Sequence, residues 1–168
     1  MFSCLRGCIL FTMERFKEAQ DRPGSGFECA LREMQAGAKQ GHWIWYVFPQ
    51  LSGLGGSSAS RTYGIRSLAE AEEYLRDPVL RSRLSTVTTA VAEHVLRGAS
   101  LDRLMGSSID ALKLVSSLTL FGHVARKLHD VEGLPAYEAM ARVAEQVLDA
   151  AASQGYGRCQ YTLDRLKP

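Results

Sequence analysis

Residues 51–65, LSGLGGSSASRTYGI, combine flexible glycines and hydroxyl side chains directly before a predicted helix. The helix is expected to begin near Ser58, and the free backbone N–H groups at a helix start favour negative charge. Glycines in front of it would let a ligand approach the backbone, because glycine has no side chain and tolerates positive φ. The structural alternative is that a serine only caps the helix. The predicted anion site comprises Gly55, Gly56, Ser57, Ser58 and Arg61.

The segment before this loop, GHWIWYVFPQ at residues 41–50, holds both tryptophans of the chain. Trp43 and Trp45 offer ring faces for a ligand, and His42 is a candidate acid or base. The alternative is structural, because aromatic rings supply much of the buried area of a small core and histidine is commonly a hydrogen-bonded structural residue. Pro49 holds the residue before it extended, so that the chain would turn back and place the loop over an aromatic floor.

A third set of candidates lies in the apolar segment IDALKLVSSLTLFGHVA, residues 109–125. Apolar residues cover most of its circumference, which predicts a helix surrounded by others at the centre of a bundle. Lys113 and Ser117 belong to a polar stripe on one side of this helix. A buried lysine must find a partner or a ligand, since an unpaired buried charge is costly. The alternative to a ligand is an ion pair with Asp110.

Sequence signatures of known chemistry are absent from the chain. It contains no G-x-S-x-G and no H-E-x-x-H, and its four histidines show no metal-ligand spacing. The pattern Gly53-x-Gly55-x-x-Ser58 matches a dinucleotide fingerprint only loosely and lacks the parallel sheet that such a site needs. We therefore predict no metal site and no cofactor. No catalytic residue can be assigned, and whether the protein is an enzyme stays open.

Helix signals recur along the chain and define the elements that must position these candidates. Ser67 and Glu70 form a capping box, and Asp77 followed by Pro78 is typical of a helix start. Helices are predicted at residues 27–38, 68–75, from 78 toward Gly98, at 100–105, at 109–125 and from Pro135 onward. WIWYVF is the only strand candidate, and in a bundle it becomes a short helix. The predicted fold is all-α: a single compact multi-helix orthogonal bundle with a central apolar helix.

Composition supports one globular domain. The chain has 168 residues, of which 46% are hydrophobic and 23% charged, and its formal net charge is +2. No lysine-arginine block could neutralise a row of phosphates, so we predict no nucleic-acid partner. The long uncharged stretch at residues 41–60 contains a proline and several glycines, so no membrane span is expected.

The cysteines and the N-terminus bear on location and domain limits. Cys4, Cys8, Cys29 and Cys159 show no disulfide spacing and follow no secretory signal, which predicts reduced thiols in a cytoplasmic protein. Residues 1–13 are expected to be an unstructured or variable leader, because an arginine interrupts their apolar run and no cleavage site follows. Residues 14–168 are expected to form the single helical domain.

Several motifs resemble one known family. HWIWYVFPQ, GLGGSSASRTYGIRSLAEAEEYLRDPVLRSRL, IDALKLVSSLTLF and TLDRL occur in that order between about Glu14 and Leu166. They resemble an uncharacterised all-helical family of unknown function that automatic labelling often calls calpastatin-like. The resemblance implies a compact helical domain and no established activity. A disordered inhibitor of that kind would have few aromatics, unlike this chain.

Two functional hypotheses follow. The first is the binding, with or without processing, of an anionic small molecule such as a nucleotide or sugar phosphate. The second is a helical protein-interaction module without a small-molecule ligand, whose working surface would be an apolar groove. An open pocket around Arg61, Lys113 and an aromatic face favours the first, and a loop packed flat on a filled core favours the second.

Overall fold

The computed structural model describes the backbone of residues 3–167 and the side chains of residues 12–167. Over this part of the chain it contains ten helices and no strand, which confirms the predicted all-α fold. The helices are α1 Ser3–Gln20, α2 Phe27–Ala36, α3 Ile44–Val47, α4 Ser58–Tyr63, α5 Leu68–Arg76, α6 Pro78–Val95, α7 Leu101–Met105, α8 Ser108–Glu132, α9 Pro135–Ser153 and α10 Gln160–Leu166.

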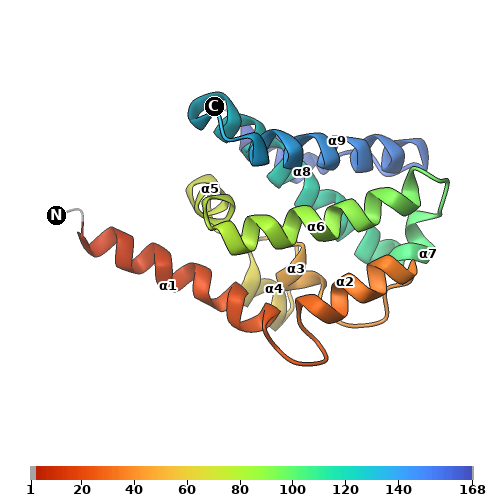
Figure 1. Ribbon diagram of the computed structural model, residues 1–168, viewed down its shortest axis with the longest axis horizontal. Coiled ribbons are helices and arrows are strands. Elements are labelled where there is room, and N and C mark those ends of the chain that lie inside the picture. The colour runs from red at the N-terminus through yellow and green to blue at the C-terminus, as the bar shows by residue number, and fades with distance from the viewer. Residues whose placement is uncertain (1–2, 168) are drawn as a thin grey trace.

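The predicted central helix is α8, which contacts α3, α5, α7, α9 and α10. Its first turn is capped by the Ser107 hydroxyl, which accepts a hydrogen bond from Asp110 N at 3.1 Å. Its most extensive packing is against α9. α9 also packs against α6, and Figure 1 shows these two helices running side by side across the molecule. Gly122 allows the close approach, because a Cβ there would lie 3.2 Å from the Ala144 side chain. The result is a long buried helix covered on most sides.

The predicted helix starts at Ser67 and Asp77 are confirmed. The Asp77 carboxylate accepts hydrogen bonds from Val79 N and Leu80 N at 3.0 and 3.1 Å, with Pro78 opening α6. The Ser67 hydroxyl accepts from Glu70 N at 3.1 Å. The Glu70 carboxylate accepts from the N–H of residue 66 at 2.7 Å instead of that of Ser67. The two caps fix the starts of α5, which packs against α8, and of α6, which packs against α5 and α9.

The aromatic segment forms α3, a single helical turn, in agreement with the bundle interpretation and against the strand. After it, an isolated parallel bridge joins Leu51 to Ile65. Ile65 N donates to Gln50 O at 2.9 Å, and Ser52 N donates to Ile65 O at 2.8 Å. These bonds tie together the two ends of residues 51–65, the segment called the glycine-serine loop below. They also fix the backbone of residue 50.

The N-terminal helix α1 begins at Ser3, inside the segment 1–13 for which a leader was expected. Its described side chains pack through Met13, Phe16 and Ala19, all of which are buried. Cys4 and Cys8 lie outside the residues whose side chains are described. Across the described residues, none of the helices combines the length and apolar character needed to span a membrane.

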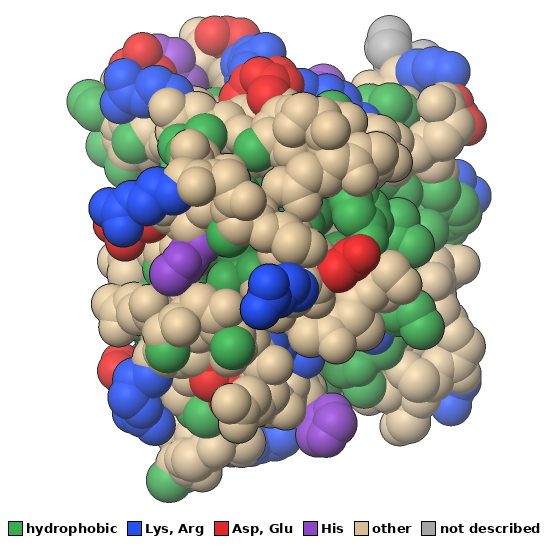
Figure 2. All heavy atoms as spheres, turned by 90° about the vertical axis from the view of Figure 1, so that its right-hand side faces the viewer, with side chains coloured by type: hydrophobic (Ala, Val, Ile, Leu, Met, Phe, Trp, Pro, Cys, Tyr) green, Lys and Arg blue, Asp and Glu red, His purple; other side chains and the backbone are tan. Residues whose placement is uncertain are grey.

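The face shown in Figure 2 carries basic, acidic and apolar side chains side by side. Lysine and arginine side chains do not gather there into one continuous patch. This face therefore has no surface resembling the basic stripe with which proteins bind nucleic-acid phosphates.

Candidate functional site

The glycine-serine loop packs directly on Trp45 and leaves no space for a water molecule between them. Ser57 caps α4, because its hydroxyl accepts a hydrogen bond from Ser60 N at 3.0 Å. The Arg61 guanidinium donates to the carbonyl oxygen of Gly56. Ser58 and Arg61 face solvent, and the positive φ of the loop falls at Gly53, at +96°, and not at Gly55 or Gly56.

The three aromatic-segment candidates lie in different surroundings. Trp43 is fully buried, and its Nε1–H donates to the Glu33 carboxylate at 2.7 Å. His42 is exposed, whereas Trp45 is half-buried. The ammonium nitrogen of Lys113 lies 3.9 Å from the centre of the Trp45 ring. A cation over an aromatic face is stabilised electrostatically, so Lys113 and Trp45 form a cation–π pair.

Asp110 joins Lys113 to a second, more deeply buried lysine. Its two carboxylate oxygens accept from Lys113 Nζ at 2.9 Å and from Lys39 Nζ at 2.6 Å. Lys39 also donates to the carbonyl oxygen of Gly41 at 2.6 Å, and its side chain is only 6% exposed. Burial raises the pKa of Asp110, but the bonds from the two ammonium groups outweigh it and hold that pKa below its usual value. The predicted partner of Lys113 is thus present, and two cations share one carboxylate.

Lys113 also lines an open cleft of ≈ 440 Å³. The cleft lies between the N-terminal half of α8, the end of the segment that follows α3, and the residues that lead into α10. Its walls are mostly apolar, and the polar groups on them are few. The lining residues are Gln50, Leu54, Ile109, Leu112, Lys113, Val115, Ser116, Gly157, Arg158, Cys159 and Gln160.

Gln50 is the most unusual of these residues. It is a polar residue that is only 8% exposed and lines the cleft. Its amide is not one of the fully enclosed polar groups without a partner, which among the described residues are Glu70 Oε1 and the Ser117 hydroxyl. Its backbone is fixed by the bridge to Ile65, so the residue stays at the cleft wall. Its amide is a potential hydrogen-bond partner for a polar ligand atom.

The short helix α10 closes the other side of the cleft. Cys159 N donates to the Thr119 hydroxyl at 3.3 Å, and the Ser116 and Thr162 hydroxyls lie 3.5 Å apart. The Tyr161 hydroxyl donates to Ser52 O at 2.7 Å, which ties α10 to the loop. Arg158 lines the cleft, but its guanidinium pairs with carboxylates of α9. The polar stripe predicted on the central helix therefore serves partly to dock α10.

Ser117, the other candidate on α8, is fully buried and does not line this cleft. Its hydroxyl has no hydrogen-bond partner among the described residues. Over the same part of the chain, no group of histidine, cysteine, aspartate and glutamate side chains is arranged to hold a metal ion.

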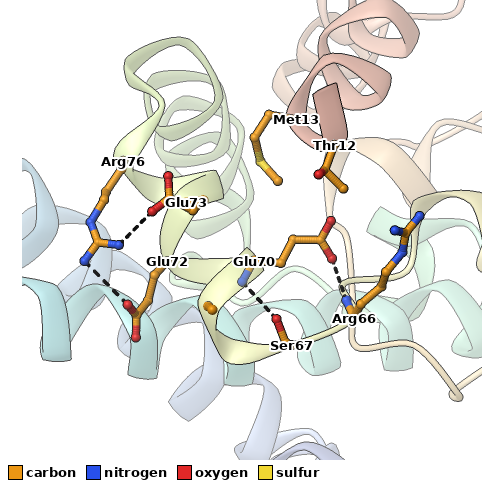
Figure 3. A pocket seen from close by; sticks show the side chains of 9 residues that line it. Thr12, Met13, Arg66, Ser67, Glu70, Glu72, Glu73 and Arg76 are labelled. Carbon is orange, nitrogen blue, oxygen red and sulfur yellow. Dashed lines mark hydrogen bonds and ion pairs between the residues drawn. The ribbon is translucent and has the colours of Figure 1, made fainter. Parts of the chain in front are cut away.

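A second cavity, of ≈ 260 Å³, lies between α1 and α5 (Figure 3). Its carboxylates are already paired. Glu73 and Glu72 contact Arg76 at 3.0 and 3.5 Å, and Glu70 contacts Arg15 at 2.8 Å. Glu70 Oε1 is close enough to Arg15 for an ion pair but lacks hydrogen-bond geometry, so its charge is compensated although the oxygen itself accepts no hydrogen bond. Because the charges around this cavity compensate one another, they give little attraction to a charged ligand.

The structure therefore places Lys113 at an open cleft, with its ammonium against the ring of Trp45, which does not itself line the cleft. It leaves His42, Ser58 and Arg61 on the surface, Ser57 in a cap, and Trp43 and Ser117 in the interior. Sequence reasoning missed Gln50 and Cys159. Gln50 ends the aromatic motif, so its position was visible, but a buried amide at a cleft can be recognised only in three dimensions. Cys159 carried no such signal, because the short helix that follows it was not predicted.

Fold and cleft together define a class: an all-α domain in which a buried central helix, a loop and a short C-terminal helix enclose a cleft of small-molecule size. The chain belongs to the family of proteins of unknown function DUF1810, whose model matches residues 10–146. The predicted membership of an uncharacterised helical family is thereby confirmed.

One solved structure is similar over nearly the whole chain. The conserved hypothetical protein Rv1873 from Mycobacterium tuberculosis is 35% identical, with a TM-score of 0.70. The alignment covers 92% of this chain and 95% of the Mycobacterium protein. No curated protein gives a significant match.

Proposed function

We propose that the cleft beside Lys113 binds a small anionic molecule with an apolar body, such as a nucleotide or a sugar phosphate carrying an apolar group. The observation that carries the proposal is the Lys113 ammonium on a mostly apolar cleft that the amide-bearing Gln50 also lines. An amide offers both a donor and an acceptor, and a lysine offers three N–H donors. One of the three Lys113 donors is bonded to Asp110. Lys113 can therefore also donate a hydrogen bond to a ligand.

The local charge supports an anion. Lys39 and Lys113 share the single carboxylate of Asp110, so the cluster carries one uncompensated positive charge. Lys39 is nearly inaccessible, whereas the side chain of Lys113 is 18% exposed and lies at the cleft. An anion arriving there gains a charge-assisted hydrogen bond in a partly desolvated site.

The walls support an apolar body on that anion. Leu54, Leu112 and Val115 line the cleft, and its volume falls in the range of about 300–1,000 Å³ that is typical of small-molecule sites. This proposal moves the site away from the glycine-serine loop, where Arg61 is bonded to its own loop and Trp45 is covered. Of the residues predicted from the sequence, Lys113 lines the proposed site, and Trp45 contacts the Lys113 ammonium without lining the cleft.

A thermal-shift screen against nucleotides and sugar phosphates tests the proposal, because a ligand that binds only the folded protein raises its melting temperature. Lys113→Met should abolish the shift. Two controls locate the site. Arg61→Ala should retain the shift, as should Lys127→Met, which removes an exposed lysine paired with Glu72 outside the cleft. A compound whose shift survives in Lys113→Met but disappears in Arg61→Ala would return the site to the loop.

One observation favours the interaction module as a second candidate. Ile109 and Leu112 are 64% and 56% exposed at the edge of the cleft, although both are large apolar side chains. A peptide with an apolar anchor would cover them. If no compound in the screen shifts the melting temperature, this second function takes precedence.

A further inference from the structure

The charges around the cleft limit the charge of its ligand. Lys39 and Lys113 bring two positive charges to the single carboxylate of Asp110, whose pKa is held below its usual value and which is therefore ionised at neutral pH. Arg158, the other cation on the cleft, is paired with two carboxylates of α9. None of the described residues that line the cleft carries a carboxylate. One unit of positive charge therefore remains for a ligand at Lys113.

This balance favours a ligand with a single negative charge. A monoanion neutralises the cluster, whereas a dianion such as a phosphate monoester leaves one negative charge uncompensated in a partly desolvated site, which is unfavourable. The Lys113 ammonium has N–H donors besides the one bonded to Asp110. A carboxylate offers two acceptor oxygens and is ionised at neutral pH. It is therefore the head group that matches the cleft best.

The apolar wall of the cleft is aliphatic. The large apolar side chains on it are Leu54, Ile109, Leu112 and Val115, and none of the described lining residues is aromatic. Ile109 and Leu112 are 64% and 56% exposed. Ile109 lies four residues before Lys113 on α8, which places the two on one face of the helix, about 5.4 Å apart along its axis. An aliphatic chain attached to an anion at Lys113 would cover the exposed side chains.

We propose that the preferred ligands of the cleft are straight-chain aliphatic monocarboxylates, with the carboxylate on Lys113 and the chain along Ile109 and Leu112. The inference rests on the proposed function, because it names the preferred members of the class of small anions with an apolar body. Nucleotides and sugar phosphates share the contact with Lys113 but cover the aliphatic wall less completely, so they bind the same cleft more weakly. The chain also accounts for the exposure of Ile109 and Leu112 without a protein partner.

Amide chemical-shift titrations of the ¹⁵N-labelled full chain test the proposal, because they give both the dissociation constant and the place of binding. The ligands are butanoate, hexanoate and octanoate. Affinity should rise about two- to fourfold for each added methylene, since burying a methylene completely gives about fourfold and the cleft is open. The backbone amides of residues 109–116 and 157–160, which border the cleft, should shift most.

A change of head group tests the charge balance. At about pH 8, octanol is uncharged and octyl phosphate is a dianion, and both should bind more weakly than octanoate. Lys113→Met should weaken octanoate at least about tenfold and should not weaken octanol, because only the carboxylate uses the ammonium. Lys127→Met, which removes an exposed lysine paired with Glu72 outside the cleft, should change neither affinity.

A change of the wall tests the position of the chain. Ile109→Ser should reduce the gain in affinity per methylene, because it removes apolar surface beside the chain. The matched control is Val131→Ser, since Val131 is 75% exposed near the other end of α8 and does not line the cleft. This control should leave the dependence on chain length as in the wild type. Both side chains are exposed, so neither change should affect folding.

Octanoate that binds no more tightly than butanoate, or octyl phosphate that binds at least as tightly as octanoate, would overturn the inference. If AMP or octyl phosphate then still binds in a way that depends on Lys113, the proposed function stands without it. If Lys113→Met weakens the binding of none of these anions, the proposed function fails as well, and octanoate has only adsorbed to apolar surface.

Discussion

Replacing Asp110 by asparagine tests the arrangement that places Lys113 at the cleft. The carboxylate holds Lys39 at 2.6 Å and Lys113 at 2.9 Å, one on each oxygen. Asparagine keeps the shape and one acceptor oxygen but loses the charge and the second acceptor. One charge-assisted hydrogen bond is therefore lost, and the buried ammonium of Lys39 no longer faces a full carboxylate.

The structure sets the expected magnitude. A hydrogen bond to a charged group contributes about 1.5–3 kcal/mol, and removing one partner of a buried ion pair costs more than removing one partner of an exposed pair. The Lys39 side chain is 6% exposed, whereas that of Lys113 is 18% exposed and partly screened by solvent. We expect Asp110→Asn to lower the free energy of unfolding by about 2–3 kcal/mol, which corresponds to roughly 5–10 °C in melting temperature for a domain of this size.

Urea denaturation of both proteins at several pH values measures this effect. The pKa of Asp110 is lowered on folding, so its stabilising contribution is fully present above the unfolded-state value of about 3.9 and is lost as the pH falls further toward the folded-state value. The difference between wild type and Asp110→Asn should therefore be largest at neutral pH and shrink below about pH 4. Asp164→Asn is the matched control, because that exposed carboxylate pairs only with neighbours of its own helix end. A difference below about 1 kcal/mol at pH 7, or one that does not narrow in acid, would refute the reasoning.

Two further predictions concern the glycine-serine loop. Gly53→Ala should lower the free energy of unfolding by about 2–3 kcal/mol in urea denaturation, because the residue has φ +96° and a Cβ would displace the Tyr161 hydroxyl from its bond to Ser52. Gly56→Ala, with normal φ and open space around it, should change stability by less than about 1 kcal/mol, and equal effects at the two positions would contradict this interpretation. Ser57→Ala should lower the free energy of unfolding by about 1 kcal/mol because it removes the helix cap, whereas Ser58→Ala should be near neutral. Thermal denaturation measures both effects. A larger loss of stability in Ser58→Ala than in Ser57→Ala would contradict the cap.

Local signals in the sequence were sufficient to predict most of the helices. Ser67, Asp77 and Pro135 mark helix starts through hydrogen bonds or fixed φ angles within a few residues, so neighbouring residues alone determine them. α10 was not predicted, because it is short and held mainly by contacts to α8 and the loop, which are distant in sequence. Short helices depend on tertiary packing more than on intrinsic propensity.

The proposed cleft was only partly predictable. Lys113 stood out because a charge on an apolar helix needs a partner, and Asp110 three residues earlier supplies it. The bond from Lys39 to the same carboxylate could not be inferred from the sequence, because Lys39 and Asp110 are far apart along the chain. Likewise the loop met the compositional requirements of an anion site, but Arg61 turned back on Gly56 and the loop closed on Trp45.

The most direct test of the proposed function is amide chemical-shift mapping of the ¹⁵N-labelled protein titrated with AMP and with a sugar phosphate that carries an apolar group. The side-chain NH₂ resonances of Gln50, assigned by their loss in Gln50→Leu, should shift with the ligand, as should the backbone amides of Cys159 and Gln160. Binding at the cleft predicts that the amides of residues 57–61 change little, and that Lys113→Met removes the Gln50 response. Shifts centred on residues 57–61, with Gln50 unmoved, would contradict the account.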